Sequence, residues 1–231
     1  MNEPFTNRKI VLDTETTGMN TSGKIYLNHK IIEIGAVEIK NRKITNNNFH
    51  QYINPNRKID ESAFKIHGIS NSFLKNKPLF SHIYLNFLNY IKNSEIIIHN
   101  ASFDVNFLNY EFSFLNTKIK DITKICKVTD TLKMARVLFP GKRNSLDALC
   151  KRYKVISNRN FHGALLDANI LAKIYLLMTS GQKSINFKIL EEKNKKNISF
   201  SNYKNNRKPF FLKSSLKDLK NHKKYLNFIK K

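Results

Sequence analysis

Apolar residues recur along the first 180 positions with two spacings, one typical of strands and the other typical of helices. Strands are expected at residues 9–12, 31–39, 49–53 and 95–99. Helices are expected at residues 60–66, 78–91, 103–115, 129–138, 145–153 and 163–178. The first three strands follow one another through short connections, which favours an antiparallel meander. A meander followed by alternating strands and helices predicts an α/β domain with a mixed sheet flanked by helices.

The pattern changes near Ser180 and Gly181, where a segment rich in Lys, Asn and Ser begins. We therefore expect one domain over residues 1–180 and a basic tail over residues 181–231. The whole chain carries 41 Lys and Arg against 17 Asp and Glu, a net charge of +24, and half of that excess lies in the tail. Such charge suits a nucleic acid partner. A coding bias toward Lys, Asn and Ile would produce it equally well, and composition leaves both explanations open.

Composition also excludes several classes of protein. No apolar run reaches the roughly 18–20 residues that a membrane span needs, and the N-terminus does not resemble a signal peptide. Cys126 and Cys150 are the only two cysteines, too few for a disulfide framework. We expect a cytoplasmic protein with no membrane partner.

Three short motifs carry candidate chemistry. Asp13 and Glu15 end an apolar strand, and side chains two residues apart on a strand share a face. Two neighbouring carboxylates repel each other unless a cation such as Mg²⁺ or Mn²⁺ lies between them. Asp104 begins a helix after a buried strand, and Asp167 lies one turn into the longest helix, just after His162. Each motif alone has an ordinary explanation: a solvated strand end, a carboxylate at a helix N-terminus, or a surface histidine.

Taken together, the order Asp-x-Glu, Asp and His-x4-Asp resembles the DEDDh family of 3′→5′ exonucleases. The residues around these positions match the family's motifs as well. They are Asp-Thr-Glu-Thr-Thr-Gly at 13–18, Asn-Ala-x-Phe-Asp at 100–104, and His-Gly-Ala-Leu-Leu-Asp at 162–167. Within that family the stretches at 30–38, 126–130 and 139–150 are similar to the epsilon, or proofreading, subunits of bacterial DNA polymerase III. The resemblance covers residues 8–187.

The resemblance implies a ribonuclease H-like fold and proofreading of DNA 3′ ends as part of the bacterial replisome. It implies two divalent ions, Mg²⁺ or Mn²⁺, with His162 as the general base. The residues implied to hold the metals are Asp13, Glu15, Asp104 and Asp167. His67 matches a family histidine that contacts the terminal nucleotide. The resemblance implies that Asp13, Glu15 and Asp167 bind the substrate as well. Where the family often has a carboxylate near the substrate sugar, this chain has Ser62, with Glu61 beside it.

Elementary chemistry agrees with this assignment, because hydrolysis of a phosphodiester needs an activated water and a stabilised leaving oxygen. Two metal ions about 3.5–4 Å apart can meet both needs. The same cluster does not separate DNA from RNA, so an RNA-trimming exonuclease is an alternative. A non-catalytic scaffold for the polymerase is another, although all five catalytic positions are intact.

Beyond the domain, Gln182, Ile185 and Phe187 resemble the peptide by which bacterial proteins bind the sliding clamp. Further on, leucines at helical spacing predict an apolar stripe that docks on the polymerase catalytic (alpha) subunit through a linker near residues 188–208. These leucines are Leu212, Leu216, Leu219 and Leu226. Clustered lysines offer a rival explanation, in which the tail holds DNA by charge alone. A small accessory, theta-like subunit is a further partner suggested by the resemblance.

Overall fold

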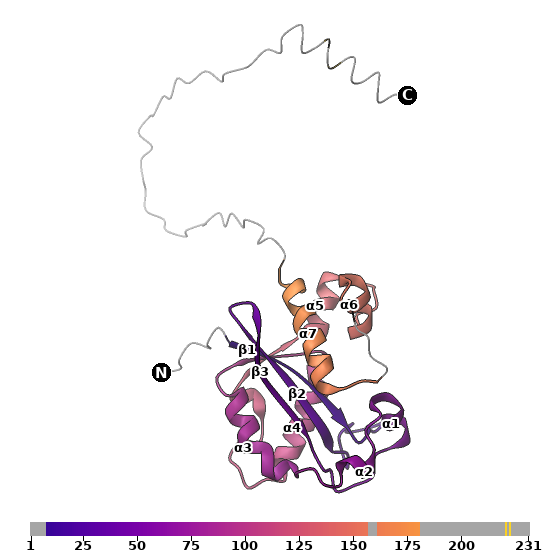
Figure 1. The fold of residues 1–231 in the computed structure, drawn as a ribbon, viewed down its shortest axis with the longest axis vertical. Coiled ribbons are helices and arrows are strands. Elements are labelled where there is room, and N and C mark those ends of the chain that lie inside the picture. The colour runs from indigo at the N-terminus through magenta and orange to yellow at the C-terminus, as the bar shows by residue number, and fades with distance from the viewer. Residues whose placement is uncertain (1–7, 157–160, 181–219, 221, 223–231) are drawn as a thin grey trace, which may run out of the picture. The chain divides into compact units, whose positions relative to one another are not determined.

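A computed structural model describes residues 8–156, 161–180, 220 and 222 of the chain (Figure 1). Its five strands form one mixed sheet in the order β3-β2-β1-β4-β5. They are β1 (Arg8–Thr16), β2 (Ile31–Lys40), β3 (Lys43–Tyr52), β4 (Glu95–Ile98) and β5 (Lys127–Asp130). The first three strands pair antiparallel, whereas β4 runs parallel to β1 and β5 runs parallel to β4. The predicted meander and mixed sheet are therefore confirmed.

Helices cover both faces of this sheet. They are α1 (Glu61–His67), α2 (Asn71–Leu74), α3 (Phe80–Ile91), α4 (Ala101–Ser113), α5 (Thr131–Leu138), α6 (Leu146–Tyr153) and α7 (Ala164–Met178), with a short 3₁₀ turn at Ile122–Lys124. Alternate residues of β1 point to opposite faces. Ile10 and Leu12 pack in an aromatic cluster with side chains of α3 and α4. Val11, between them, packs instead against Ala168 and Ala172 of α7.

The central strands are apolar because both faces are covered. Residues 10–12 of β1 and the first nine residues of β2 are buried, as expected of strands that lie between two helical layers. Behind α7, helices α5 and α6 form a further small core (Figure 1). The sheet thus holds the end of β1 rigidly between two layers of helices.

Most predicted elements lie within two residues of their observed bounds, with three exceptions in the sheet. Strand β1 continues to Thr16, four residues past the predicted end at residue 12. Strand β3 begins at residue 43 rather than 49, because Asn41 and Arg42 both adopt positive φ and form a tight hairpin turn. Strand β5 was missed, and residues 129–130 were wrongly assigned to a helix. Asp130 ends that strand and caps α5, accepting hydrogen bonds from the N–H groups of Leu132 and Lys133. A four-residue edge strand of partly exposed residues carries little periodicity to detect.

Within the described part of the chain, no helix combines the length and apolarity needed to cross a membrane. Lys220 and His222 are helical and exposed. The predicted clamp peptide at residues 182–187 and the leucine stripe at 212–226 lie outside the described residues, so both stay predictions, as does the domain boundary near residue 180.

Candidate active site

The site is organised around the carboxyl end of β1. Asp13 and Glu15 lie on the face of the sheet that α7 covers, which is also the face of Val11. In the antiparallel register, Gly35 of β2 lies opposite Asp13, and Glu33 lies opposite Glu15. Both carboxylates are half-buried. The predicted pairing of two acidic side chains on one strand face is therefore what the structure contains.

The first turn of α7 lies directly on this pair of strands. A β-carbon built on Gly35 would come within 2.1 Å of the backbone nitrogen of Leu165 and 2.2 Å of the carbonyl carbon of Ala164. Real side chains do not approach backbone so closely, so only glycine fits at this position. The missing side chain lets the helix backbone touch the strand, and this brings the helix that carries Asp167 against Asp13 and Glu15.

Glu33 fixes the beginning of the same helix. Its buried carboxylate accepts a hydrogen bond from the backbone N–H of Ala164 at 3.1 Å, and its other oxygen lies 2.7 Å from Nε2 of His50 on β3. A carboxylate at a helix N-terminus satisfies a backbone donor and interacts favourably with the helix dipole. Glu33 therefore ties β2, β3 and α7 together one residue after Gly163.

Three predicted site residues meet at this point. Glu15, His162 and Asp167 each offer a ligand atom, and these atoms all lie within 4.8 Å of one another. Nδ1 of His162 is 2.9 Å from Oδ2 of the buried Asp167, while 42% of the His162 side chain is exposed. The backbone N–H of His162 also donates to the carbonyl of Ile66 at 3.0 Å. His162 thus lies just before the helix, as predicted, and on the same site as Asp167.

Asp104 reaches the end of β1 from the opposite face. It lies in the first turn of α4, is almost fully buried, and accepts a hydrogen bond of 2.7 Å from the hydroxyl of Thr14. Burial, with a small contribution from the charge of Asp130, raises the pKa of Asp104 to about 7 against the opposing effect of the Thr14 hydroxyl. Neither Asp13 nor Asp104 belongs to the three-residue group above, so the structure gathers the five predicted residues around one strand end, not into one tight cluster.

His67 lies beside the same strand end at the close of α1. Its Nδ1 accepts a hydrogen bond of 2.9 Å from the backbone N–H of Ile69, which places the ring proton on Nε2. Nε2 is buried and faces the Thr16 carbonyl without a hydrogen bond of good geometry. Burial lowers the pKa of His67, and that carbonyl opposes the shift less strongly. Ser62 and Glu61 are both exposed at the start of α1, where Glu61 pairs with Lys65 at 2.9 Å.

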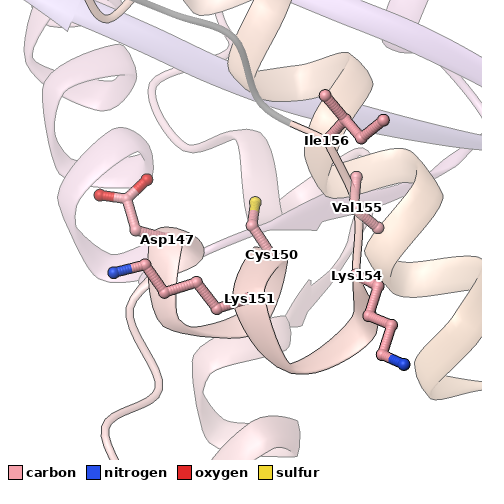
Figure 2. A pocket seen from close by; sticks show the side chains of 6 residues that line it. All are labelled: Asp147, Cys150, Lys151, Lys154, Val155 and Ile156. Carbon is pink, nitrogen blue, oxygen red and sulfur yellow. The ribbon is translucent and has the colours of Figure 1, made fainter.

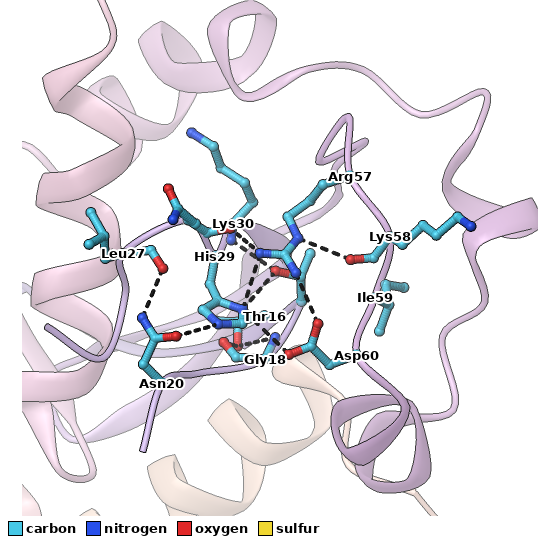
Figure 3. Close-up of polar contacts among 12 residues, drawn as sticks. Thr16, Gly18, Asn20, Leu27, His29, Lys30, Arg57, Lys58, Ile59 and Asp60 are labelled. Carbon is cyan, nitrogen blue, oxygen red and sulfur yellow. Dashed lines mark hydrogen bonds and ion pairs between the residues drawn. The ribbon is translucent and has the colours of Figure 1, made fainter. Parts of the chain in front are cut away.

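A polar network holds the loop that follows β1 (Figure 3). The carbonyl of Thr17 accepts from the N–H of Asp60 at 2.8 Å, and Arg57 pairs with the Asp60 carboxylate at 2.9 Å. His29 is buried between Asn20 and Asp60, and burial lowers its pKa. Gly18 has a φ of +138°, and a β-carbon there would lie 2.5 Å from Asp60 Oδ2. The loop is therefore fixed against the segment that leads into α1.

Comparison with known proteins identifies the family of this chain. The sequence model of the exonuclease family matches residues 10–175, which contain every residue of the site. The DNA polymerase III epsilon subunit of Buchnera aphidicola subsp. Schizaphis graminum is 58% identical over 228 residues, covering 97% of this chain and 98% of the relative. The chain belongs to the exonuclease family and, within it, to the DNA polymerase III epsilon subunits. The expectation of a 3′→5′ proofreading exonuclease is thereby confirmed.

Other relatives support this family. The epsilon subunit of Escherichia coli K12 is 58% identical over 181 residues, covering 78% of this chain and 74% of the relative. A structure of exonuclease X in complex with 5′-overhanging duplex DNA aligns with a TM-score of 0.57 at 26% identity, over 75% of this exonuclease and 92% of that chain. The nuclease domain of 3′hExo, a DEDDh family member bound to rAMP, aligns at 0.61 and 15% identity, over 78% and 94% of the two chains, and so shares the fold. Exonucleases of this kind depend on divalent metal ions, and the group of Glu15, His162 and Asp167 is a candidate site for one.

Sequence reasoning missed three residues that build the site of this exonuclease: Thr14, Glu33 and Gly35. Glu33 left a signal, since a carboxylate in the middle of an otherwise apolar strand must find buried partners. Thr14 and Gly35 left none, because their roles depend on helices far away in the sequence.

A separate hollow lies on α6, away from the site (Figure 2). It is lined by Asp147, Cys150, Lys151, Lys154, Val155 and Ile156. None of these residues was predicted to act in catalysis, and the hollow contains no member of the acidic site. It carries no functional assignment for this exonuclease.

Proposed function

We propose that the chain hydrolyses the last phosphodiester bond of an unpaired DNA 3′ end and releases nucleoside 5′-monophosphates, as a cytoplasmic component of the bacterial replisome. The observation that supports this best is the meeting of Glu15, His162 and Asp167 within 4.8 Å at the end of β1. Glu15 and Asp167 offer oxygen ligands for a metal ion, and the imidazole of His162 beside them can act as a base, as a metal-dependent hydrolase requires. Unpaired ends should react faster, because a terminus must leave the duplex to reach these residues.

In this proposal Asp13, Glu15 and Asp167 hold two divalent ions, and Asp104 completes the acidic set from the other side of β1. Carboxylate oxygens prefer hard cations, so Mg²⁺ or Mn²⁺ is the expected pair. When bound, such ions supply a more acidic water and stabilise negative charge on the leaving oxygen. The mutual repulsion of half-buried carboxylates supports a cation at this point.

His162 is proposed as the general base. If Nδ1 carries a proton, it donates that proton to Oδ2 of Asp167, and Nε2 keeps a lone pair that can accept a proton from water. The water oxygen then bonds to phosphorus, the bond from phosphorus to the 3′ oxygen breaks, and that oxygen leaves with a proton. His67 is proposed to donate from Nε2 to the terminal nucleotide, a contact that would satisfy a buried donor.

Two variants test the active site. Asp13→Ala should abolish metal-dependent release of 5′-monophosphates from single-stranded DNA while circular dichroism shows a folded protein. His162→Ala should lose roughly 10²–10⁴-fold in rate, and the fall in rate at low pH should disappear with it. Full activity of Asp13→Ala in Mg²⁺ would refute the assignment. Parallel assays with RNA of equal length address the alternative of RNA trimming, since rapid degradation of RNA alone would favour it.

We also propose that Gln182, Ile185 and Phe187 bind the sliding clamp. The support is their order and their place directly after the catalytic domain. A short peptide that becomes ordered on binding loses entropy, so micromolar or weaker affinity is expected. Replacing Gln182 and Phe187 with Ala should weaken clamp binding in titrations and leave the cleavage of free oligonucleotides unchanged.

The C-terminal segment is proposed to dock on the polymerase alpha subunit through the leucine stripe of residues 212–226. A chain truncated at Gly181 should fail to co-purify with that subunit at moderate salt, yet still cleave free DNA. Because phosphate contacts weaken steeply with salt and apolar contacts do not, the salt response separates docking on the polymerase from DNA binding by charge. A theta-like subunit is a further proposed partner, to be sought by the same co-purification.

A further inference from the structure

A basic cavity opens at the carboxyl end of β4, outside the acidic site. Its volume is about 500 Å³. The residues that line it are His99, Asn100, Leu132, Arg136, Lys142, Arg143, Asn144, Ser145 and Leu146, all in the described part of the chain. Three of them are cations and none is acidic. No hydrogen bond or ion pair joins the side chains of these three cations to the described residues. A carboxylate does lie at the wall, because Asp130 accepts a hydrogen bond from the N–H of Asn100 at 3.2 Å.

The loop that carries two of these cations is held from behind by Arg152 of α6. Its guanidinium donates to the carbonyl of Arg143 at 2.8 Å and to Oδ1 of Asn144 at 3.0 Å, and it lies 4.2 Å from the centre of the Phe139 ring. Asn144 in turn donates to the Phe139 carbonyl at 3.3 Å. The loop backbone is thus fixed while the side chain of Arg143 remains exposed. A rigid loop loses little entropy when it binds a ligand.

The opposite wall is fixed as well. The Thr131 hydroxyl lies 3.1 Å from the carbonyl of Ile98 and 2.9 Å from Nδ1 of His99. Asn100 is the N-cap of α4, which brings the positive end of that helix dipole to the cavity. The cavity therefore combines exposed cations with a preformed wall.

The cavity lies close to the reacting end of the substrate. Strands β1 and β4 are parallel neighbours with Val11 opposite Ile97, so Asp13 and His99 each lie two residues beyond this pair, toward the carboxyl ends of the two strands. Neighbouring strands are about 4.8 Å apart. A DNA strand that ends at the acidic residues carries one phosphate per nucleotide, so a phosphate a few nucleotides from the cleaved bond is within reach of this cavity.

We propose that Arg136, Lys142 and Arg143 form a subsite for a backbone phosphate of the DNA strand that is being cut. The proposal rests on the exonuclease function stated above and extends it to a second point of attachment for the substrate. The subsite would hold the strand in place while its 3′ end lies among the carboxylates. It reads no sequence, because phosphates are the same at every position.

The test uses the full chain with Arg136→Gln, Lys142→Gln and Arg143→Gln, singly and together. Two substrates are compared in Mg²⁺: single-stranded DNA of ten nucleotides, and the p-nitrophenyl ester of thymidine 5′-monophosphate, which has no upstream phosphate. Lys151→Gln is the matched control, since it removes the same charge on α6 but lines the other hollow (Figure 2).

Each single variant should raise KM for the oligonucleotide about tenfold, as for the loss of one charged hydrogen bond, with kcat unchanged. The logarithm of the DNA-binding constant falls linearly with the logarithm of the salt concentration. The slope of this line should become less steep by about 0.7 for each phosphate that is no longer neutralised. The variants should cleave the nitrophenyl ester at the same rate as the unchanged protein. A second test replaces one phosphate of the oligonucleotide at a time with a neutral methylphosphonate. With the unchanged protein, this replacement should raise KM at a single position. With the variants, the replacement at that position should raise KM no further.

Two results would overturn the subsite. One is a KM for the oligonucleotide equal to that of Lys151→Gln, and the other is an equal loss of activity on the nitrophenyl ester. Failure of the exonuclease assignment itself would look different, because the unchanged protein would then cleave neither substrate.

Discussion

The two faces of the sheet deliver the catalytic carboxylates in different ways. On one face, α4 brings Asp104 to β1 across a layer of large side chains that includes Phe107 and Phe112. On the other, α7 brings Asp167 to the sheet with Ala168 and Ala172 in the packed layer and with the backbone of Ala164 and Leu165 against Gly35. Large flexible side chains can adjust to a change, whereas backbone against backbone cannot. The position of Asp167 should therefore be far less tolerant of substitution than that of Asp104.

The largest difference is expected from Gly35→Ala. The added methyl group would lie about 2 Å from the backbone of α7, so the helix must move, and a misplacement near 1 Å can cost about 10²-fold in rate. We expect at least that loss in kcat on single-stranded DNA, together with a lower Tm.

The matched change on the other face is Phe107→Leu. It should destabilise the fold by about 1–3 kcal/mol and leave the kcat of the folded protein within a few-fold of its original value. If kcat falls as far in Phe107→Leu as in Gly35→Ala, at a temperature where both variants are folded, the proposed difference between the two faces is wrong.

A further test on the α7 side concerns Glu33, which holds the beginning of that helix. Glu33→Gln keeps an acceptor for the N–H of Ala164 and loses the charge opposite His50, so the expected cost is about 1–2 kcal/mol of unfolding free energy. Glu33→Ala leaves the N–H of Ala164 without its acceptor and should cost about 1–3 kcal/mol more than Glu33→Gln. Urea unfolding measures the difference between the two variants. Equal costs for Gln and Ala would show that Glu33 does not anchor the helix.

The remaining comparison concerns pH and belongs to the α4 side. Because the pKa of Asp104 is about 7 in the folded chain and near 3.8 when unfolded, the folded state binds its proton more tightly. Metal-free protein should therefore lose stability as pH rises from about 4 to about 7. Asp104→Asn should remove that loss.

The depressed pKa values of His29 and His67 act in the opposite sense, since their contribution is lost as pH falls below about 6.5. The difference between Asp104→Asn and the unchanged protein, measured by urea unfolding with a chelator present, isolates the carboxylate. A difference that does not vary with pH would contradict the burial argument.

The sequence predicted most of the fold because the central strands and the long helices have strong apolar periodicity. It missed β5, whose four partly exposed residues give no such signal. For the site, the motifs predicted Asp13, Glu15, Asp104, His162 and Asp167, since chemistry restricts these residue types. They could not predict Gly35 or Thr14, because the close approach of α7 and the hydrogen bond to Asp104 exist only after distant segments pack.

The placement of Asp13 on the first strand and Asp167 on the last described helix also bears on biosynthesis. A chain emerging from the ribosome contains the first carboxylates of the site long before it contains the last, and the two meet only through contacts of great sequence separation. A partly made or partly unfolded chain therefore has no complete site. We therefore expect no metal-dependent cleavage from a chain that ends before α7, because it lacks Asp167.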